Sequence, residues 1–465
     1  MKKKKKNIDE FSIGYYLIFY YEIFCGRIFY RKIQVANKDR IPRNKPVIFA
    51  LNHQNAVMDA LVVLNSYRRN ILFLARADAF KNPVILKILT LFKMLPVYRM
   101  RDGVSELGKN EEIFQTTIGV LSRKRCPVGL MPEGNHGNKR QLRPLVKGVF
   151  RIAFRAQEEY GEEDGVQIVP VGLDYEKYTN FRTKLFVNYG EPVSVNQFFK
   201  AYKEDPARAT NAIRSKLSEE MSKNMIDIRS AEFYDMYMNL RTIYNHSMRT
   251  RLNIPRKDLY SRFKADKEMI RILEEKESND PAQIKSISEK VKIYTEGITN
   301  LGFRDWLFGR NRYSYLLLLP LSLALLIMFP LFLYGLINNI IPYKLPLLFT
   351  KKFKDPQFHS TVKFIVGLII FPIWYLILFI LAWIIVEPGW IKWVYLASLI
   401  PLGLFAHTWF IWFKKLRSMW KYSFMTSIKN FRIAGLKSLR AEIISAVDTI
   451  MEKEESPQNN KSASQ

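Results

Sequence analysis

The sequence predicts an α/β fold with a mostly parallel central sheet and helices on both faces, followed by a helical connector and membrane-embedded helices. Between Pro46 and Tyr189, short apolar runs alternate with helix-prone stretches, as in sheets whose parallel strands are joined by helices. Residues 226–312 are charged and poor in glycine, which is typical of solvated or surface helices. Three long apolar runs follow, and each reaches the membrane-crossing length of about 20 residues.

The first region, residues 1–39, is basic and then aromatic. Lys2 to Lys6 are consecutive lysines, which favour an acidic lipid surface, although a nuclear signal is the alternative. No small-residue cleavage site follows them, so we expect no signal peptide. The aromatic stretch from Phe11 to Tyr30 is interrupted by Glu22 and Arg27. We therefore expect a pair of interfacial helices here rather than a membrane span.

Residues 40–225 are predicted to form the α/β domain. Its apolar runs predict six strands: Val47–Leu51, Ile71–Ala75, Leu95–Tyr98, Val128–Met131, Ile168–Leu173 and Lys184–Tyr189. The stretches between and after them predict five helices: Val57–Ser66, Asn82–Phe92, Val104–Ser122, Val149–Tyr160 and Gln197–Met225. The charged residues 226–312 form the predicted connector, divided at its prolines.

The membrane region is predicted at residues 313–413, and its three apolar runs are Tyr315–Ile337, Phe364–Val386 and Trp393–Phe413. A basic helical tail, residues 414–465, follows and turns polar and disordered from Ser456.

Three full spans would place this basic tail across the membrane from the α/β domain, against the tendency of basic loops to stay inside. We therefore expect the first run to be re-entrant, broken by Pro320 and Pro330. The other two runs would then form a hairpin around the turn Glu387-Pro388-Gly389.

Composition limits the partners and the chemistry. The formal net charge of +29 indicates an anionic partner, either nucleic acid or a phospholipid surface. The apolar runs favour membrane phospholipids and argue against nucleic acid. The two cysteines, Cys25 and Cys126, provide no disulfide framework, and the five histidines show no zinc-type spacing. We therefore expect no metal, and an integral membrane protein whose catalytic domain faces the reducing cytoplasm.

One motif places a histidine and an aspartate at the end of the first predicted strand. It is Asn52-His53-Gln54-Asn55-Ala56-Val57-Met58-Asp59. Open α/β sheets carry their chemistry at the carboxyl ends of strands, and an aspartate there can fix the imidazole tautomer so that the other nitrogen acts as a base. Taken alone, such a pair is more often structural than catalytic.

Three further signatures follow in order along the chain. Leu95-Pro96-Val97-Tyr98-Arg99 ends a strand with an arginine, and Met131-Pro132-Glu133-Gly134-Asn135-His136-Gly137 ends another strand and turns on glycine. Lys139, Arg140 and Arg143 come next, and Ile168-Val169-Pro170-Val171 is an apolar strand with a proline.

Together these signatures resemble the four sequence blocks of the glycerolipid acyltransferase family, and the resemblance covers residues 40–195. It implies a membrane-bound enzyme of phospholipid synthesis that moves a fatty acyl group to the hydroxyl of glycerol-3-phosphate or 1-acylglycerol-3-phosphate. The donor would be acyl-CoA or acyl-carrier protein, used as a co-substrate, with no further cofactor. The hydroxyl would attack directly, without an acyl-enzyme intermediate.

The resemblance also assigns roles to residues. His53 would be the general base and Asp59 would orient it, while Arg99 would bind the phosphate of the acceptor. Glu133 and Gly134 would line the acceptor site. The other polar residues expected to contact substrate are Asn55, Asn135, His136, Lys139 and Arg140.

For several of these residues, a structural or solvent-exposed role is the alternative to substrate binding. Arg99 can be an ordinary surface arginine, and Glu133 can cap the following helix. Lys139, Arg140 and Arg143 either form a solvated face or hold a phosphate-rich donor such as CoA. His136 is either a polar contact for the acceptor or a second acid–base group.

Two departures from the family pattern keep the acceptor open. Five residues separate His53 from Asp59, where most members have four, so the turn between them must be rebuilt. The usual threonine–arginine–serine after Gly134 is replaced by Asn135-His136-Gly137. The alternatives are therefore acylation of a phosphate-free acceptor, such as an aminoacyl lipid, or a non-catalytic membrane scaffold.

Overall fold

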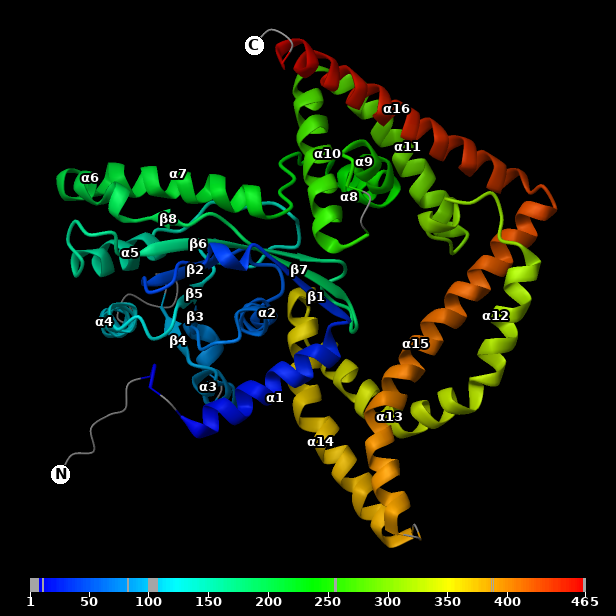
Figure 1. Ribbon diagram of the computed structural model, residues 1–465, viewed down its shortest axis with the longest axis horizontal. Coiled ribbons are helices and arrows are strands. Elements are labelled where there is room, and N and C mark those ends of the chain that lie inside the picture. Colours follow the sequence, from blue (N-terminus) through cyan, green and yellow to red (C-terminus); the bar gives the residue numbers. More distant parts are fainter. Residues whose placement is uncertain are drawn as a thin grey trace. The chain divides into compact units, whose positions relative to one another are not determined.

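The computed structural model describes residues 8–10, 12–81, 83–98, 108–254, 257–385, 387 and 389–462. The chain forms two compact units, which Figure 1 colours along the sequence. The first contains Met1–Asp227 together with Lys352–Phe364, and the second contains Ile228–Lys351 and Ile365–Gln465.

A sheet organises the first unit (Figure 1). Its described strands are β1 (Lys32–Ala36), β2 (Val47–Leu51), β3 (Leu72–Arg76), β4 (Met94–Val97), β5 (Val128–Leu130), β6 (Gln167–Tyr175), β7 (Lys184–Tyr189) and β8 (Val193–Ser194). The strand order is β1-β7-β6-β2-β5-β3-β4, and β8 also pairs with β6. The pairs β6–β7 and β6–β8 are antiparallel, and the other described pairs are parallel. The mostly parallel sheet predicted from the sequence is therefore confirmed.

The two faces of the sheet are covered by different helices, because side chains alternate along each strand. Ile48 and Ala50 of β2 belong to a core cluster with residues of α4 (Lys109–Ser122), α5 (Gly148–Glu158) and α7 (Pro206–Asn224). Phe49, between them, points the other way and makes an edge-to-face contact with Tyr67 of α2 (Val57–Tyr67). The sheet is thus closed on both sides, which is why all five residues of β2 are buried.

The remaining helices of the first unit correct two predictions. The predicted pair of interfacial helices is a single helix, α1 (Ile13–Phe29), which Ser12 caps and which Glu22 and Arg27 do not interrupt. The helix predicted at Gln197–Met225 is interrupted: α6 (Phe199–Glu204) ends before Asp205, which then caps α7, with Pro206 in its first turn. The short strands β1 and β8 were not predicted. α3 (Pro83–Leu91) matches its prediction.

The second unit is helical among its described residues. Its helices are α8 (Tyr234–Ile243), α9 (Asn245–Arg251), α10 (Leu259–Asn279), α11 (Pro281–Asn300), α12 (Tyr315–Ile327), α13 (Phe329–Thr350), α15 (Gly389–Ser427) and α16 (Phe431–Ser462). α14 (His359–Ile385) begins in the first unit and continues into the second. Short 3-10 helices lie at Lys38–Arg40, Ala77–Phe80, Asn196–Phe198, Asp305–Leu307 and Pro356–Phe358.

Three described helices are long and apolar enough to cross a membrane: Phe329–Thr350, Pro356–Ile385 and Gly389–Ser427. The first predicted run, Tyr315–Ile337, is two helices, and they meet at Met328 beside Pro330. Pro320 lies inside α12 and does not end it. The break was predicted, but the helix after it is longer than the short piece expected. α16 also continues past Ser456, where the sequence predicts disorder.

Candidate active site

The candidate site begins where β2 ends, between its neighbours β5 and β6. Asn52 extends the pairing with β6 through its side chain. Its amide oxygen accepts from the Leu173 backbone N–H at 2.7 Å, and its amide nitrogen donates to the Leu173 carbonyl at 3.1 Å. Because both bonds are buried, they fix the end of the strand and set the starting direction of His53.

A rebuilt turn brings Asp59 back to His53. Ala56 adopts φ 46°, a positive value that is uncommon for a residue with a Cβ atom, and α2 starts directly after it. Asp59 lies in the first turn of α2, where the backbone N–H groups favour a carboxylate. Its Oδ2 accepts from the backbone N–H of Gln54 at 2.9 Å and of Asn55 at 2.8 Å, and it lies 2.9 Å from His53 Nδ1. The expected imidazole–carboxylate pair is therefore present despite the longer spacing.

Tyr175, at the end of β6, completes the environment of Asp59. Its hydroxyl donates to Asp59 Oδ1 at 2.6 Å, and both side chains are fully buried. Burial raises the pKa of Tyr175 well above its ordinary value, and the neighbouring Asp59 charge adds to this effect. The tyrosine therefore stays a proton donor to the carboxylate. Sequence reasoning missed Tyr175, because an apolar strand gives no sign of which residue will meet Asp59.

Glu133 reaches His53 from the adjacent strand. β5 runs parallel to β2, so the residues after the two strands meet at the same edge of the sheet. Glu133 Oε1 accepts from the His53 backbone N–H at 3.0 Å, and Oε2 accepts from Arg143 Nε at 2.8 Å. Burial raises the pKa of Glu133, while Arg143 acts in the opposite direction. Glu133 thus supports the backbone of the histidine, and Arg143 compensates the buried charge.

The glycines after Glu133 shape the loop around the same histidine. Gly134 has φ 71°, a conformation that favours glycine, and a Cβ atom there would lie 3.0 Å from Val146. The Gly137 backbone N–H donates to the His53 carbonyl at 3.1 Å. The third sequence block therefore holds His53 at both its N–H and its carbonyl.

His136 lies beside His53, with their ring centroids 5.4 Å apart and nearly perpendicular. Its Nε2 lies 2.9 Å from Asp355 Oδ2, and the Phe358 ring is 4.9 Å away on an edge-to-face contact. Burial lowers the pKa of His136, although Asp355 acts in the opposite direction. Asp355 and Phe358 belong to the 352–364 segment, which packs with the first unit and which the sequence did not indicate as part of the site.

The other predicted substrate ligands occupy varied positions. Asn55 donates to the Tyr178 carbonyl at 3.3 Å, and the Lys139 carbonyl accepts from Gln54. Arg140 Nε donates to Asp174 at 2.9 Å and its guanidinium also contacts the Tyr175 carbonyl, so it braces β6. The Asn135 carbonyl accepts from Arg143. Arg99 lies outside the described residues. A role in substrate binding remains a prediction for all of them.

Part of the chain is similar to known proteins. A family profile described as Acyltransferase matches residues 32–174, which contain strands β1 to β5, all of β6 except Tyr175, and the His53–Asp59 pair. The domain belongs to the glycerolipid acyltransferase family.

Relatives of this acyltransferase domain occur in yeast. Glycerol-3-phosphate O-acyltransferase 2 of Saccharomyces cerevisiae is 31% identical over 176 residues, which is 35% of this chain and 23% of that protein. Glycerol-3-phosphate O-acyltransferase 1 of the same organism is 24% identical over 48% of this chain and 29% of its own length. The chain thus matches only about a quarter of each relative.

Among solved structures, the 1-acyl-sn-glycerophosphate acyltransferase PlsC of Thermotoga maritima shares 19% identity. The match has a TM-score of 0.30 and covers 44% of this chain and 80% of that chain.

The two thiols, Cys126 in the acyltransferase domain and Cys25 in α1, are not activated. Burial raises the pKa of Cys126 and of Cys25 to about 11 each, so both remain protonated at neutral pH. Within the described residues, no three His, Cys, Asp or Glu side chains gather in a way that would hold a metal ion.

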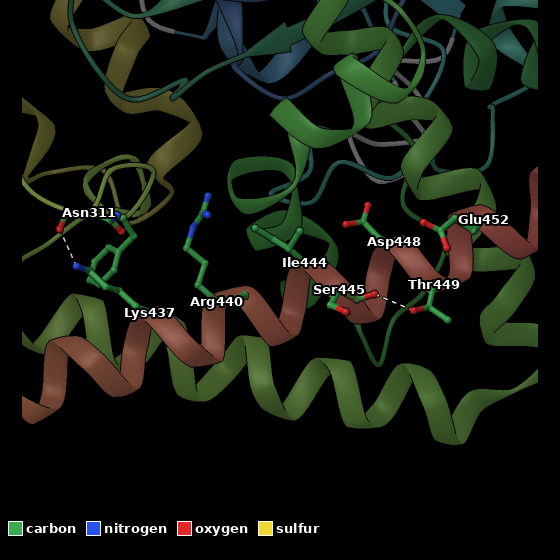
Figure 2. A pocket seen from close by; sticks show the side chains of 10 residues that line it. Asn311, Lys437, Arg440, Ile444, Ser445, Asp448, Thr449 and Glu452 are labelled. Carbon is green, nitrogen blue, oxygen red and sulfur yellow. Dashed lines mark hydrogen bonds between the residues drawn. The ribbon is translucent and has the colours of Figure 1, made fainter.

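A pocket of about 550 Å³ lies outside this domain, along α16 of the second unit (Figure 2). Its charged side chains are already paired: Lys437 donates to the Asn311 carbonyl, Arg440 to Asp305, and Asp448 accepts from Tyr244. None of these residues belongs to the four sequence blocks. We assign the pocket no catalytic role.

Proposed function

We propose that this protein is a membrane-bound O-acyltransferase of phospholipid synthesis. It transfers a fatty acyl group from acyl-CoA or acyl-carrier protein to a hydroxyl of glycerol-3-phosphate or 1-acylglycerol-3-phosphate. The observation that carries the proposal is the buried Asp59 carboxylate held against His53 Nδ1. Within the described part of the chain, His53 Nε2 has no hydrogen-bond partner, and the side chain is 13% exposed.

The arrangement supports a direct transfer. With Nδ1–H donated to Asp59, the Nε2 lone pair accepts the proton of the acceptor hydroxyl as its oxygen attacks the thioester carbon. The C–S bond then breaks, and the thiolate leaves and takes that proton from His53. Asp59 stabilises the transient imidazolium, much as the carboxylate does in a Ser–His–Asp triad. No side-chain nucleophile is required.

The acceptor is proposed from the relatives and from the sequence motif. Both yeast proteins are named glycerol-3-phosphate O-acyltransferases, and Arg99 is the predicted phosphate ligand. A guanidinium suits a phosphate because two parallel N–H donors meet two oxygens. Lys139, Arg140 and Arg143 are the candidates for holding a phosphate-rich donor, although Arg140 also donates to Asp174 and Arg143 also donates to Glu133.

The membrane-length helices fit this substrate class, because the acyl product partitions into the bilayer. Acyl-CoA and acyl-carrier protein are water-soluble, so we propose that the acyltransferase domain faces the cytoplasm. The lysines at the N-terminus add attraction to acidic phospholipid, about 1 kcal/mol for each lysine near the surface.

The test is acyl transfer by membranes that contain His53→Ala, with labelled acyl-CoA and glycerol-3-phosphate and the lipid product identified by mass spectrometry. Loss of the base should lower kcat by roughly 10²- to 10⁴-fold. His246→Ala, an exposed histidine on α9, is the matched control and should retain wild-type activity. Full turnover by the His53 variant would refute the assignment of the base.

One observation favours a second candidate, a phosphate-free acceptor such as an aminoacyl lipid. His136, paired with Asp355, occupies the position where the family pattern carries an arginine. Excess glycerol-3-phosphate should then fail to inhibit acylation of the other lipid, whereas it competes if it shares the acceptor site.

A further inference from the structure

The segment 352–364 is separated from the rest of the first unit by more than a hundred residues, yet it is fastened to the loop after β6. Ser360 Oγ donates to the Tyr178 carbonyl, and Lys363 Nζ donates to the Thr179 carbonyl at 2.8 Å. The Phe364 ring meets Phe29 edge-to-face at 5.4 Å. Gln357 and Ser360 are buried, at 3% and 0% exposure. These contacts fix the position of Asp355 at the start of the segment.

Asp355 fixes the orientation of His136 in turn. Asp355 Oδ2 lies 2.9 Å from His136 Nε2, and the Gln357 amide lies beside both groups. Because an ionised carboxylate can only accept, this contact assigns the proton to Nε2. The rings of His53 and Phe358 confine the imidazole. The His136 side chain is 11% exposed. The site therefore contains two imidazole–carboxylate pairs side by side, and only the His53 pair has a counterpart in the family motif.

This orientation decides what His136 can bind. When Nε2 carries the proton toward Asp355, Nδ1 keeps its lone pair and accepts a hydrogen bond. No partner for Nδ1 is found among the residues that the structure describes. A neutral acceptor nitrogen attracts a hydroxyl group and offers nothing to a phosphate oxygen, which is also an acceptor. Burial, which lowers the pKa of His136, keeps the ring neutral.

We propose that His136 binds the hydroxyl next to the reacting one on the acceptor, and that Asp355 is the positioning residue that fixes its tautomer. The proposal rests on the acyltransferase function above and narrows its substrate. Glycerol-3-phosphate has two neighbouring hydroxyls, whereas 1-acylglycerol-3-phosphate has one free hydroxyl. Of these two acceptors, the proposal therefore favours glycerol-3-phosphate, with its phosphate held away from His136.

The experiment compares glycerol-3-phosphate with propane-1,3-diol monophosphate, which lacks the middle hydroxyl. Acylation from labelled acyl-CoA is measured in membranes for the wild type, Asp355→Asn and His136→Phe. The wild type should prefer glycerol-3-phosphate in kcat/KM by roughly 10- to 100-fold, the effect of leaving one polar group unpaired. Both variants should bring this ratio close to one, raise the KM for the acceptor and leave the KM for acyl-CoA unchanged.

His359→Gln is the matched control. It lies in the same segment, but its ring is half-buried and in the described structure bonds the nearby Phe353 carbonyl, so the variant should keep the wild-type preference. A wild type that uses both acceptors equally, or an Asp355→Asn variant with an unchanged ratio, overturns the proposal while acyl transfer stands. If the wild type acylates neither compound, glycerol-phosphate acylation is refuted, and this proposal is refuted with it.

Discussion

Asp59 accepts more hydrogen bonds than the orientation of one imidazole requires. Two backbone N–H groups, the His53 ring and the Tyr175 hydroxyl share its two oxygens. A buried carboxylate is costly unless it is fully hydrogen-bonded, and here the bonds come from the turn, the histidine and a neighbouring strand. The residue that orients the base therefore also ties β2, α2 and β6 together.

Tyr175→Phe tests this structural role. Removing a hydrogen bond to a charged group should lower the free energy of unfolding by about 1.5–3 kcal/mol. Tyr189→Phe is the matched control, because that buried hydroxyl bonds the neutral Ser66 Oγ at 2.6 Å and should cost only about 0.5–1.5 kcal/mol. Denaturant unfolding of the purified protein measures both, and equal losses would contradict the special role of Tyr175.

Glu22 predicts a pH dependence of stability. It is 1% exposed on α1, where Asn65 donates to Oε1 at 2.7 Å, and burial raises its pKa to about 8. Between the ordinary glutamate pKa and 8 the folded protein holds one more proton here than the unfolded chain, so stability falls as pH rises through this interval.

At pH 8, Glu22→Gln should therefore have a free energy of unfolding higher than that of the wild type, by an amount of order a few kcal/mol. Thermal unfolding of the two proteins measures the difference. The difference should shrink as the pH approaches 4.5. Glu163→Gln, at an exposed glutamate, should change the unfolding free energy by less than about 0.5 kcal/mol. A Glu22 variant that gives the same difference at every pH would contradict the expected protonation.

At the scale of elements, α13 and α15 approach closely at a glycine. A Cβ atom on Gly335 would lie 2.1 Å from the Leu402 carbonyl oxygen, and Asn339 on the same helix donates to the Leu399 carbonyl at 3.2 Å. Tyr375 of α14 donates to Asn339 Oδ1 at 2.7 Å, so one asparagine joins three helices. Small residues and interhelical hydrogen bonds are the usual means of packing helices in lipid.

Gly335→Val should lower the free energy of unfolding of the detergent-purified protein by roughly 1–3 kcal/mol and lower its melting temperature. The reason is that the backbones of α13 and α15 must move apart to make room for the valine. Gly367→Val is the control on α14, since the nearest atom to its Cβ position, on Phe371, is 3.8 Å away. Similar melting temperatures for the two variants would show that α13 and α15 do not pack through Gly335.

Local patterns predicted some of these elements and missed others for physical reasons. Val47–Leu51 is an uninterrupted apolar run and was placed without error, as was Lys184–Tyr189. Lys32–Ala36 alternates polar and apolar residues at the edge of the sheet and was not recognised. The sequence predicted one helix over Gln197–Met225, but the structure has two, and the second begins at Pro206. Pro320, in contrast, lies inside α12 without ending it.

The candidate site shows the same division. The His53–Asp59 pair was predictable because one short sequence motif contains both residues. Glu133 was expected from the third sequence block as a residue that lines the acceptor site, and its contact with the His53 backbone was not predicted. Tyr175 and Asp355 were not predictable, since they lie 116 and 219 positions from their partners and their neighbours carry no distinctive pattern. Contacts between distant segments depend on packing, which local periodicity does not encode.

At the scale of the whole molecule, the charge of the tail predicts its orientation in the membrane. Lys414, Lys415, Arg417 and Lys421 lie in the second half of α15, and basic residues next to membrane helices favour the cytoplasmic side. We expect the C-terminus and the acyltransferase domain to lie on the same side, with α12 and the start of α13 re-entrant. Labelling of single cysteines in sealed vesicles, with Cys25 and Cys126 replaced by serine, tests this. If a cysteine at the C-terminus and a cysteine in the acyltransferase domain are labelled from opposite sides of the membrane, the expected orientation is wrong.

The order in which the chain leaves the ribosome gives the 352–364 segment a further consequence. The sheet and His53 emerge early, but Asp355 and Phe358 are synthesised only after α13. A nascent or truncated chain that stops at Asp227 therefore carries the base without the second pair. If that pair governs which alcohol is accepted, a newly made enzyme gains its selectivity only once translation has passed the first membrane helices.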